Sequence, residues 1–175
     1  LMELDAIKEV IGVWQKEYTL LGNDPDINHV QIFENKGSVM GCSNPHPHGQ
    51  IWAQRSIPQE VEKKTIQQKN HWNQKGSSLL GDYLKQEVQS GDRIILENET
   101  FVALVPYWAV WPFETMIIPK NHRVSIAELS AQEVRDYAEI LKNLTIRYDN
   151  LFETSFPYSA GIHQSPTNGE VNKFW

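Results

Sequence analysis

One order of elements occurs twice along the chain, and this repeat limits the possible folds more than any other property of the sequence. Residues 1–22 carry apolar side chains at helical spacing, and residues 30–34 then alternate apolar and polar side chains, as a half-buried strand does. A second long helix begins at Ser130 and Glu133, which have the spacing of a capping box, and a strand is expected at 156–163. In each copy a loop with glycine or histidine follows the strand. The repeat predicts two related lobes, of which the second copy is incomplete.

The residues between the two copies predict a helix and a small antiparallel sheet. A glutamine- and lysine-rich helix is expected at 59–78, with a linker at its last four residues. Strands are expected at 93–96, 101–105 and 114–118, with Asn98 in a hairpin between the first two. The predicted fold class is α+β, with helices flanking antiparallel sheets. The linker divides the chain into two incomplete lobes: residues 1–76 are expected to be the C-terminal part of the first lobe, and residues 77–175 the N-terminal part of the second.

Composition and charge exclude several classes of protein. The chain has 175 residues, a net charge of −6 and no basic stripe, which argues against a nucleic-acid groove. No apolar run approaches the roughly 20 residues of a membrane span, and charges within the first helix argue against a signal peptide. The single cysteine, Cys42, excludes an intrachain disulfide. We therefore expect a cytoplasmic protein with neither nucleic-acid nor membrane partners.

The segment Asn44–Gln50 carries the strongest sign of chemistry. It closes a stretch, 35–50, that is rich in Gly and Pro and is expected as one long loop before a return strand at 51–53. Its prolines favour extended geometry, in which residues two apart point the same way. His46 and His48 should therefore share one side of a stiff backbone, which suits a nucleophile that needs fixed aim. The alternative for such a tripeptide alone is a rigid turn with no catalytic role.

Several motifs along the chain resemble one known family. The matching segments are Phe33–Gly37, Met40–Ala53, Val105–Ala109, Trp111–Thr115, Arg147–Phe152 and Ser155–Ser159. Together they are similar to the galactose-1-phosphate uridylyltransferase family, which belongs to the histidine-triad superfamily. The resemblance runs nearly from end to end, and it implies two histidine-triad-like lobes built on half-barrel sheets. The first expected lobe would hold the active-site loop.

The resemblance also implies a reaction and the residues that perform it. His48 matches the histidine that takes UMP from UDP-glucose as a covalent uridylyl group and passes it to galactose 1-phosphate, a step of the Leloir pathway of galactose metabolism. Glucose 1-phosphate and UDP-galactose are the products. Gln50 matches a residue that stabilises charge on the phosphoryl oxygens, and no general acid is needed because a sugar phosphate is a stable leaving group. The residues that match the UDP-sugar-binding set are Phe33, Asn35, Gly41, Cys42, Ser43 and Gln50.

Two metal sites and a dimer are further implications of the resemblance. His46 matches one ligand of a zinc ion, and His163 matches a ligand of a second iron or zinc ion. The second site should include a glutamate where this sequence has Lys64, and an ammonium group repels a cation. The second site is then lost, altered, or completed by Glu60, one helical turn away. The family also implies a homodimer.

Other functions stay open from the sequence alone. A related dinucleoside-polyphosphate phosphorylase would share Gln50 and a phosphate-type leaving group. A non-catalytic chain that binds nucleotide or metal is the alternative of a different class. His29, His71 and His122 have no clustered partners in the sequence and are expected at the surface.

Overall fold

A computed structural model of the chain describes residues 2–40, 48–169 and 173–175. These residues form two antiparallel three-stranded sheets, in the orders β2-β1-β6 and β3-β4-β5, together with long helices. The α+β class expected from the sequence is confirmed. In chain order the elements are α1 (Leu4–Gly22), β1 (His29–Lys36), η1 (Ser38–Met40), β2 (His48–Gln54), α2 (Gln59–Lys75), α3 (Leu79–Ser90), β3 (Ile94–Glu97), β4 (Phe101–Leu104), β5 (Met116–Pro119), η2 (Ile126–Glu128), α4 (Ala131–Phe152) and β6 (Tyr158–Ile162).

Helix α1 covers one face of the first sheet. Val30 and Ile32 of β1 are fully buried and pack in one cluster with Ile11 and Tyr18 of α1. Burial against α1 explains why apolar and polar residues alternate in β1, because successive side chains of a strand point to opposite faces. The burial of these apolar side chains is what holds α1 against the sheet.

Strand β6 joins segments that are far apart in the sequence. It pairs antiparallel with β1, so that Ile32 lies opposite Ile162 and Lys36 lies opposite Tyr158. The first sheet therefore contains strands from both sides of the expected boundary at residue 76. The division into two lobes at that residue stays a prediction.

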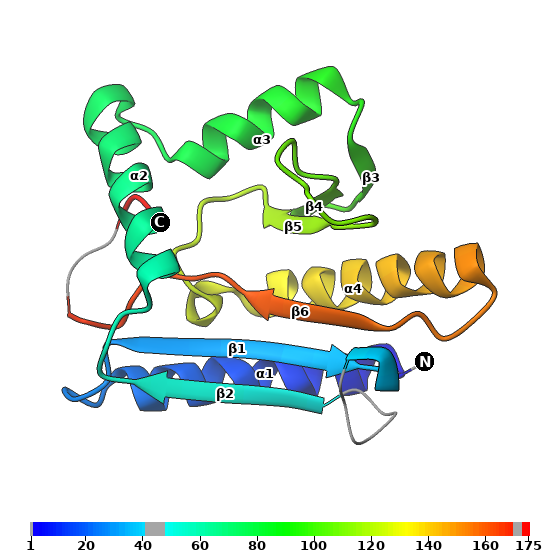
Figure 1. Ribbon diagram of the computed structural model, residues 1–175, viewed down its shortest axis with the longest axis horizontal. Coiled ribbons are helices and arrows are strands. Elements are labelled where there is room, and N and C mark those ends of the chain that lie inside the picture. The colour runs from blue at the N-terminus through cyan, green and yellow to red at the C-terminus, as the bar shows by residue number, and fades with distance from the viewer. Residues whose placement is uncertain (1, 41–47, 170–172) are drawn as a thin grey trace.

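Helix α4 lies between the two sheets and runs alongside β6 (Figure 1). Strand β4 is buried on both faces, which explains its continuous apolar run. One face packs against α3 and the other against α4. The residues buried on the α3 side are Leu84, Val102, Leu104 and Ile118, and those on the α4 side are Phe101, Ala103, Ile140 and Leu144.

The helix ends follow from local sequence. Ser130 accepts a hydrogen bond from the Glu133 N–H while the Glu133 side chain accepts one from the Ser130 N–H, so the predicted capping box is confirmed. Gly76, in the left-handed region, ends α2, and Ser78 caps α3 by accepting from Gly81 N. The predicted linker is thus a junction between two helices. No described helix has the length and apolar character needed to cross a membrane.

Two expectations need correction. No helix is predicted at 79–90, where the structure has α3. Apolar residues at helical spacing, Leu80, Leu84 and Val88, were an available signal for it. The long loop expected at 35–50 is too long at both ends. Strand β2 begins at His48, which pairs with Asn35 of β1, and β1 continues to Lys36 through its pairing with β6.

Candidate active site

The candidate catalytic residues lie on the face of the first sheet that points away from α1. A side-chain carbon placed on Gly49 would lie 3.6 Å from Nε1 of Trp14 in α1, so Gly49 faces that helix. Its neighbours His48 and Gln50 therefore point to the opposite face, because side chains alternate along a strand. Strand register, and not the course of a loop, sets which residues meet on this face.

Two cross-strand rows bring the predicted residues together. Asn35 of β1 lies opposite His48 of β2 on one side and opposite Ser159 of β6 on the other. In the next row on the same face, Phe33 lies opposite Gln50. Directly opposed residues in antiparallel strands have their β-carbons about 5 Å apart. Four residues expected from sequence to act on the nucleotide thus form one contiguous patch.

Contacts within this patch orient the Gln50 amide. Trp52 donates a hydrogen bond from Nε1 to Oε1 of Gln50 at 3.2 Å. The Trp52 ring packs edge-on against Phe33, with ring centroids 5.3 Å apart. Because Oε1 of Gln50 accepts from Trp52, the Nε2 amino group of Gln50 is left to donate on the other side of the amide. A phosphoryl oxygen accepts hydrogen bonds, so this amino group is the end of the side chain that could bind one. The sequence-based prediction assigns no role to Trp52. Its position two residues after Gln50 was the available signal, because residues two apart on a strand lie on the same face.

Asn35 is held by the strand that the second half of the chain contributes. Ser159 donates a hydrogen bond from its hydroxyl to Oδ1 of Asn35. On the other face, Tyr158 donates to a carboxylate oxygen of Glu34, and burial together with this carboxylate raises the pKa of the Tyr158 hydroxyl. These bonds fix the end of β1, which carries the candidate nucleotide-binding residues.

The Arg147–Phe152 and Ser155–Ser159 motifs support this end of the sheet. Asp149 in α4 accepts a hydrogen bond from the Phe156 N–H at 2.8 Å and pairs with Lys36 of β1 at 3.6 Å. The Phe156 ring stacks on Tyr148, with centroids 4.7 Å apart. The motif residues therefore join the end of α4 to the strand ends beside His48.

Four expected site residues lie outside the described residues: Gly41, Cys42, Ser43 and His46. The structure gives no geometry for them. Their roles in nucleotide and zinc binding stay predictions.

His163 lies at a second place, directly after β6. Its Nδ1 is 3.1 Å from Nζ of Lys64 in α2. The pKa of the His163 imidazole is lowered, first by loss of hydration between the surrounding protein groups, then by the charge of Lys64 and by His29. Glu60, expected as a substitute metal ligand, pairs instead with Lys63 at 2.8 Å. An ammonium cannot ligate a cation, so Lys64 does not supply the carboxylate ligand that the resemblance implies, and the second metal site stays a prediction.

The expectation that the remaining histidines lie at the surface is wrong for His29. Its side chain is buried, with 3% exposure, and burial lowers the pKa of its imidazole. His71 is partly buried and contacts Asp82, its Nε2 lying 2.9 Å from Oδ2 of that residue. His122 is exposed, as expected. The burial of His29 depends on segments distant in sequence, which its flanking residues do not reveal.

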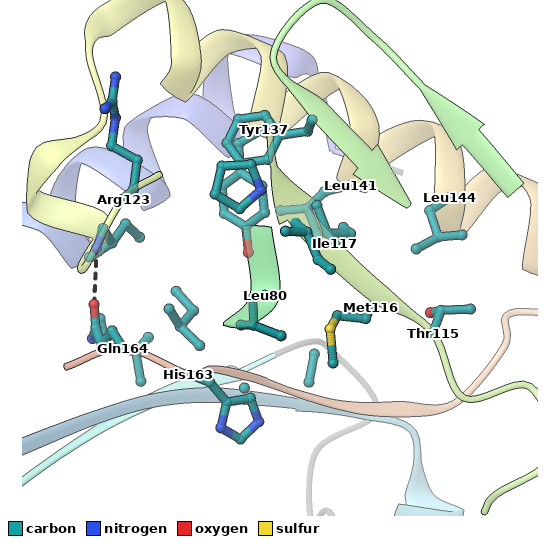
Figure 2. Close-up of a pocket in the computed structure, with 18 of the residues that line it drawn as sticks. Leu80, Thr115, Met116, Ile117, Arg123, Tyr137, Leu141, Leu144, His163 and Gln164 are labelled. Atoms are coloured by element: carbon teal, nitrogen blue, oxygen red, sulfur yellow. Dashed lines mark hydrogen bonds between the residues drawn. The ribbon is translucent and has the colours of Figure 1, made fainter. Parts of the chain in front are cut away.

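A large cleft beside the first sheet overlaps the candidate site only in part. It has a volume of about 2520 Å³ and is lined by side chains such as Leu141, Leu144 and Met116, as Figure 2 shows. Ligand pockets are usually about 300–1,000 Å³. Of the described residues of β2, Gly49 and Ile51 line it, whereas His48 and Gln50 do not. Phe33 of the candidate patch lines this cleft, whereas the candidate catalytic pair, His48 and Gln50, points to the other face of the sheet.

Two family models together match nearly the whole chain. The family described as galactose-1-phosphate uridyl transferase matches in two parts, its N-terminal domain over residues 1–58 and its C-terminal domain over residues 60–175. The chain belongs to this family. Nearly the whole length of the sequence, and both sheets, fall within the two matches.

Curated relatives carry the same name. The chain is 54% identical over 169 residues to "Galactose-1-phosphate uridylyltransferase" of Haemophilus influenzae, a match that covers 97% of this chain and 48% of the relative. The protein of that name from Saccharomyces cerevisiae is 45% identical, with 99% of this chain and 50% of the relative covered. The chain thus spans about half the length of the curated relatives it matches.

Solved structures share the fold. One described as "Structure of uridylyltransferase" superposes with a TM-score of 0.88 at 29% identity, covering 94% of this chain and 52% of the other. An ADP-glucose phosphorylase from Arabidopsis thaliana with bound ADP-glucose gives a TM-score of 0.87 at 25% identity, covering 99% of this chain and 54% of that one. The fold therefore accommodates more than one nucleotide-sugar reaction.

Proposed function

We propose that the complete protein exchanges UMP between UDP-glucose and galactose 1-phosphate, with His48 as the residue that carries the uridylyl group. The observation that supports this most is the patch on the first sheet, where His48 and Gln50 lie beside Phe33 and Asn35. The family to which the chain belongs supports the choice of substrate. The corresponding enzyme is UDP-glucose–hexose-1-phosphate uridylyltransferase.

The proposed chemistry has two displacements at one phosphorus atom. In the first, an imidazole nitrogen of His48 bonds to the α-phosphorus of UDP-glucose, and the bond from that phosphorus to the glucose 1-phosphate oxygen breaks. In the second, a phosphate oxygen of galactose 1-phosphate bonds to the same phosphorus, and the bond to His48 breaks to give UDP-galactose. A neutral imidazole is a competent nucleophile at physiological pH, and both leaving groups are stable without added protons.

The neighbours of His48 have separate roles in this proposal. Gln50 donates a hydrogen bond from Nε2 to a phosphoryl oxygen, whose negative charge grows during each displacement. Trp52 holds the amide in the orientation that presents this donor. Phe33 and Asn35 contact the UDP part, together with the backbone of Gly41, Cys42 and Ser43.

Three further properties belong to the same proposal. Zinc binding, with His46 as one ligand, rests on the resemblance, and metal analysis of the purified complete protein tests it. A homodimer is supported by a run of exposed apolar side chains, which another protein surface would cover; they are Val105, Tyr107, Trp108, Val110, Trp111 and Phe113. A cytoplasmic location suits substrates that are phosphorylated sugars and nucleotide sugars.

Intact-mass measurement of the complete protein tests the covalent step. After incubation with UDP-glucose and a neutral quench, the mass should rise by one uridylyl group, and acid should remove it. The His48→Ala variant should gain nothing. The matched control is His122→Ala, which removes an exposed histidine outside the first sheet and should form the adduct as the wild type does. An unmodified wild-type protein, zinc-loaded and folded, would overturn the proposal and favour a non-catalytic nucleotide-binding protein.

A phosphorylase acting on ADP-glucose is the second candidate, because a protein of that description shares the fold. The same assay separates the two when UDP-glucose and ADP-glucose are compared at equal concentration. An adenylyl adduct that forms faster than the uridylyl adduct would favour the phosphorylase. The higher identity to uridylyltransferases, 54% against 25%, favours the uridylyl adduct.

A further inference from the structure

Helix α2 and the end of β6 meet through one polar contact. Lys64 and His163 are 99 residues apart in the sequence, yet Nζ of Lys64 lies 3.1 Å from Nδ1 of His163. A lysine ammonium has three donors and no acceptor, so the imidazole must be the acceptor. His163 is therefore neutral, with its proton on Nε2 and its Nδ1 lone pair directed at Lys64.

This arrangement removes the donors that a metal ion would need. A ligating histidine must offer a lone pair, and the Nδ1 lone pair of His163 is engaged by Lys64. The ammonium has no lone pair and carries the same sign of charge as the metal. The nearest candidate carboxylate on α2, that of Glu60, is paired with Lys63.

We propose that the Lys64 ammonium stands in place of the second metal ion that the resemblance implied, so that a hydrogen bond and not a metal joins α2 to the end of β6. The two residues after His163 make hydrogen bonds to the segment that precedes α4. Gln164 accepts a hydrogen bond from the Ile126 N–H at 3.1 Å, and His163 and Gln164 point in different directions from the strand end (Figure 2). Ser165 donates its N–H to the Val124 carbonyl at 2.9 Å.

Helix α2 also contacts the last residues of the chain close to Lys64, so the Lys64–His163 hydrogen bond is not its only tertiary contact. Val61 packs with Phe174 and Trp175, and Trp175 donates from Nε1 to the Thr65 hydroxyl at 3.1 Å. These contacts keep α2 folded when the charge at residue 64 is changed. Variants at Lys64 are therefore expected to fold, so that their metal content and Tm can be compared with those of the wild type.

Metal content of the complete protein is the first test, and it does not depend on the proposed activity. Wild type and His163→Ala, both saturated with zinc or ferrous iron and then desalted, should contain the same number of metal equivalents. Lys64→Glu should gain one equivalent, and the double variant Lys64→Glu/His163→Ala should lose that gain. The control Lys63→Glu, which adds the same charge one residue away on the same helix, should gain none.

Two results would overturn the proposal. A wild-type protein that loses one metal equivalent on His163→Ala binds a metal at this position after all. A Lys64→Glu variant that gains no metal shows that the ammonium is not what excludes it.

Thermal unfolding tests the connection itself. Lys64→Met should lower Tm by about 2 °C relative to Lys69→Met, an exposed lysine on the same helix, in the same zinc-containing buffer, since an exposed charge-assisted hydrogen bond is lost. Equal Tm values for the two variants would show that the contact does not join α2 to β6.

Discussion

Replacing Gly37 with alanine should destabilise the protein more than an ordinary glycine substitution does. Gly37 follows β1 directly and has a φ of +96°, a backbone conformation that an L-residue adopts at a cost of about 1–2 kcal/mol. A β-carbon at this position would lie 2.7 Å from Cβ and 3.3 Å from Cα of Pro157. Because the proline ring is rigid, it cannot move aside as a flexible side chain would, and overpacking of this kind costs about 1–3 kcal/mol. The expected loss for Gly37→Ala, with both effects added, is about 3 kcal/mol.

Gly76 provides the matched control, since only the backbone term applies there. Its φ is +70°, and no atom lies within 4 Å of the position that a β-carbon would take. Gly76→Ala should therefore cost about 1 kcal/mol. Urea unfolding followed by circular dichroism measures both free energies, and a difference of about 2 kcal/mol corresponds to a midpoint shift of about 1 M. Equal losses in the two variants would show that Pro157 does not restrict the position, and the reasoning would fail.

Three further changes test other contacts. Hydrogen bonds, the largest effect coming from Ser77, hold the pKa of the Asp82 carboxyl at about 2, so its contribution to stability is present above about pH 4 and is lost as pH falls through about 2. Asp82→Asn should therefore lower Tm at pH 7 but not at pH 2. An equal loss of Tm at both pH values would contradict this. Arg93→Met removes the bidentate hydrogen bond that the Arg93 guanidinium donates to the buried Glu87 carboxylate. The free energy of unfolding, measured in urea, should fall by about 2 kcal/mol. The loss is smaller than for a fully buried pair because Arg93 is partly exposed. Ser130→Ala removes the N-cap of α4 and should cost about 1 kcal/mol, whereas Ser130→Thr, which keeps the hydroxyl, should cost clearly less in the same assay.

The elements that the sequence predicts well are those whose signals come from residues close together in the sequence. Helices α1 and α4 each bury one face, so their apolar spacing is visible in the sequence, and the Ser130–Glu133 box marks where α4 begins. The strands β3, β4 and β5 lie within a few residues of their predicted bounds. In each case the residues that decide the structure are neighbours in the sequence.

The elements that the sequence misses depend on distant partners. Helix α3 is an exception, because its apolar residues have helical spacing and Ser78 caps it, so both signals were present in the sequence. The pairing of β6 with β1 joins residues more than 120 positions apart, as the Ser159–Asn35 hydrogen bond shows. No local pattern specifies such a partner, because many exposed strand edges offer the same backbone hydrogen bonds.

The placement of His48 on a strand changes what the site can do. The sequence favours a proline-stiffened loop, whereas the structure makes His48 the first residue of β2, opposite Asn35 of β1. A residue in a hydrogen-bonded ladder is held by its neighbours on the next strand, and sites built on strands are more exact than sites built on loops. The ladder also fixes Gln50 on the same face, two residues on. In the proposed reaction, the aim of the imidazole at phosphorus and the aim of the amide at the phosphoryl oxygen would therefore have one common cause, the register between β1 and β2.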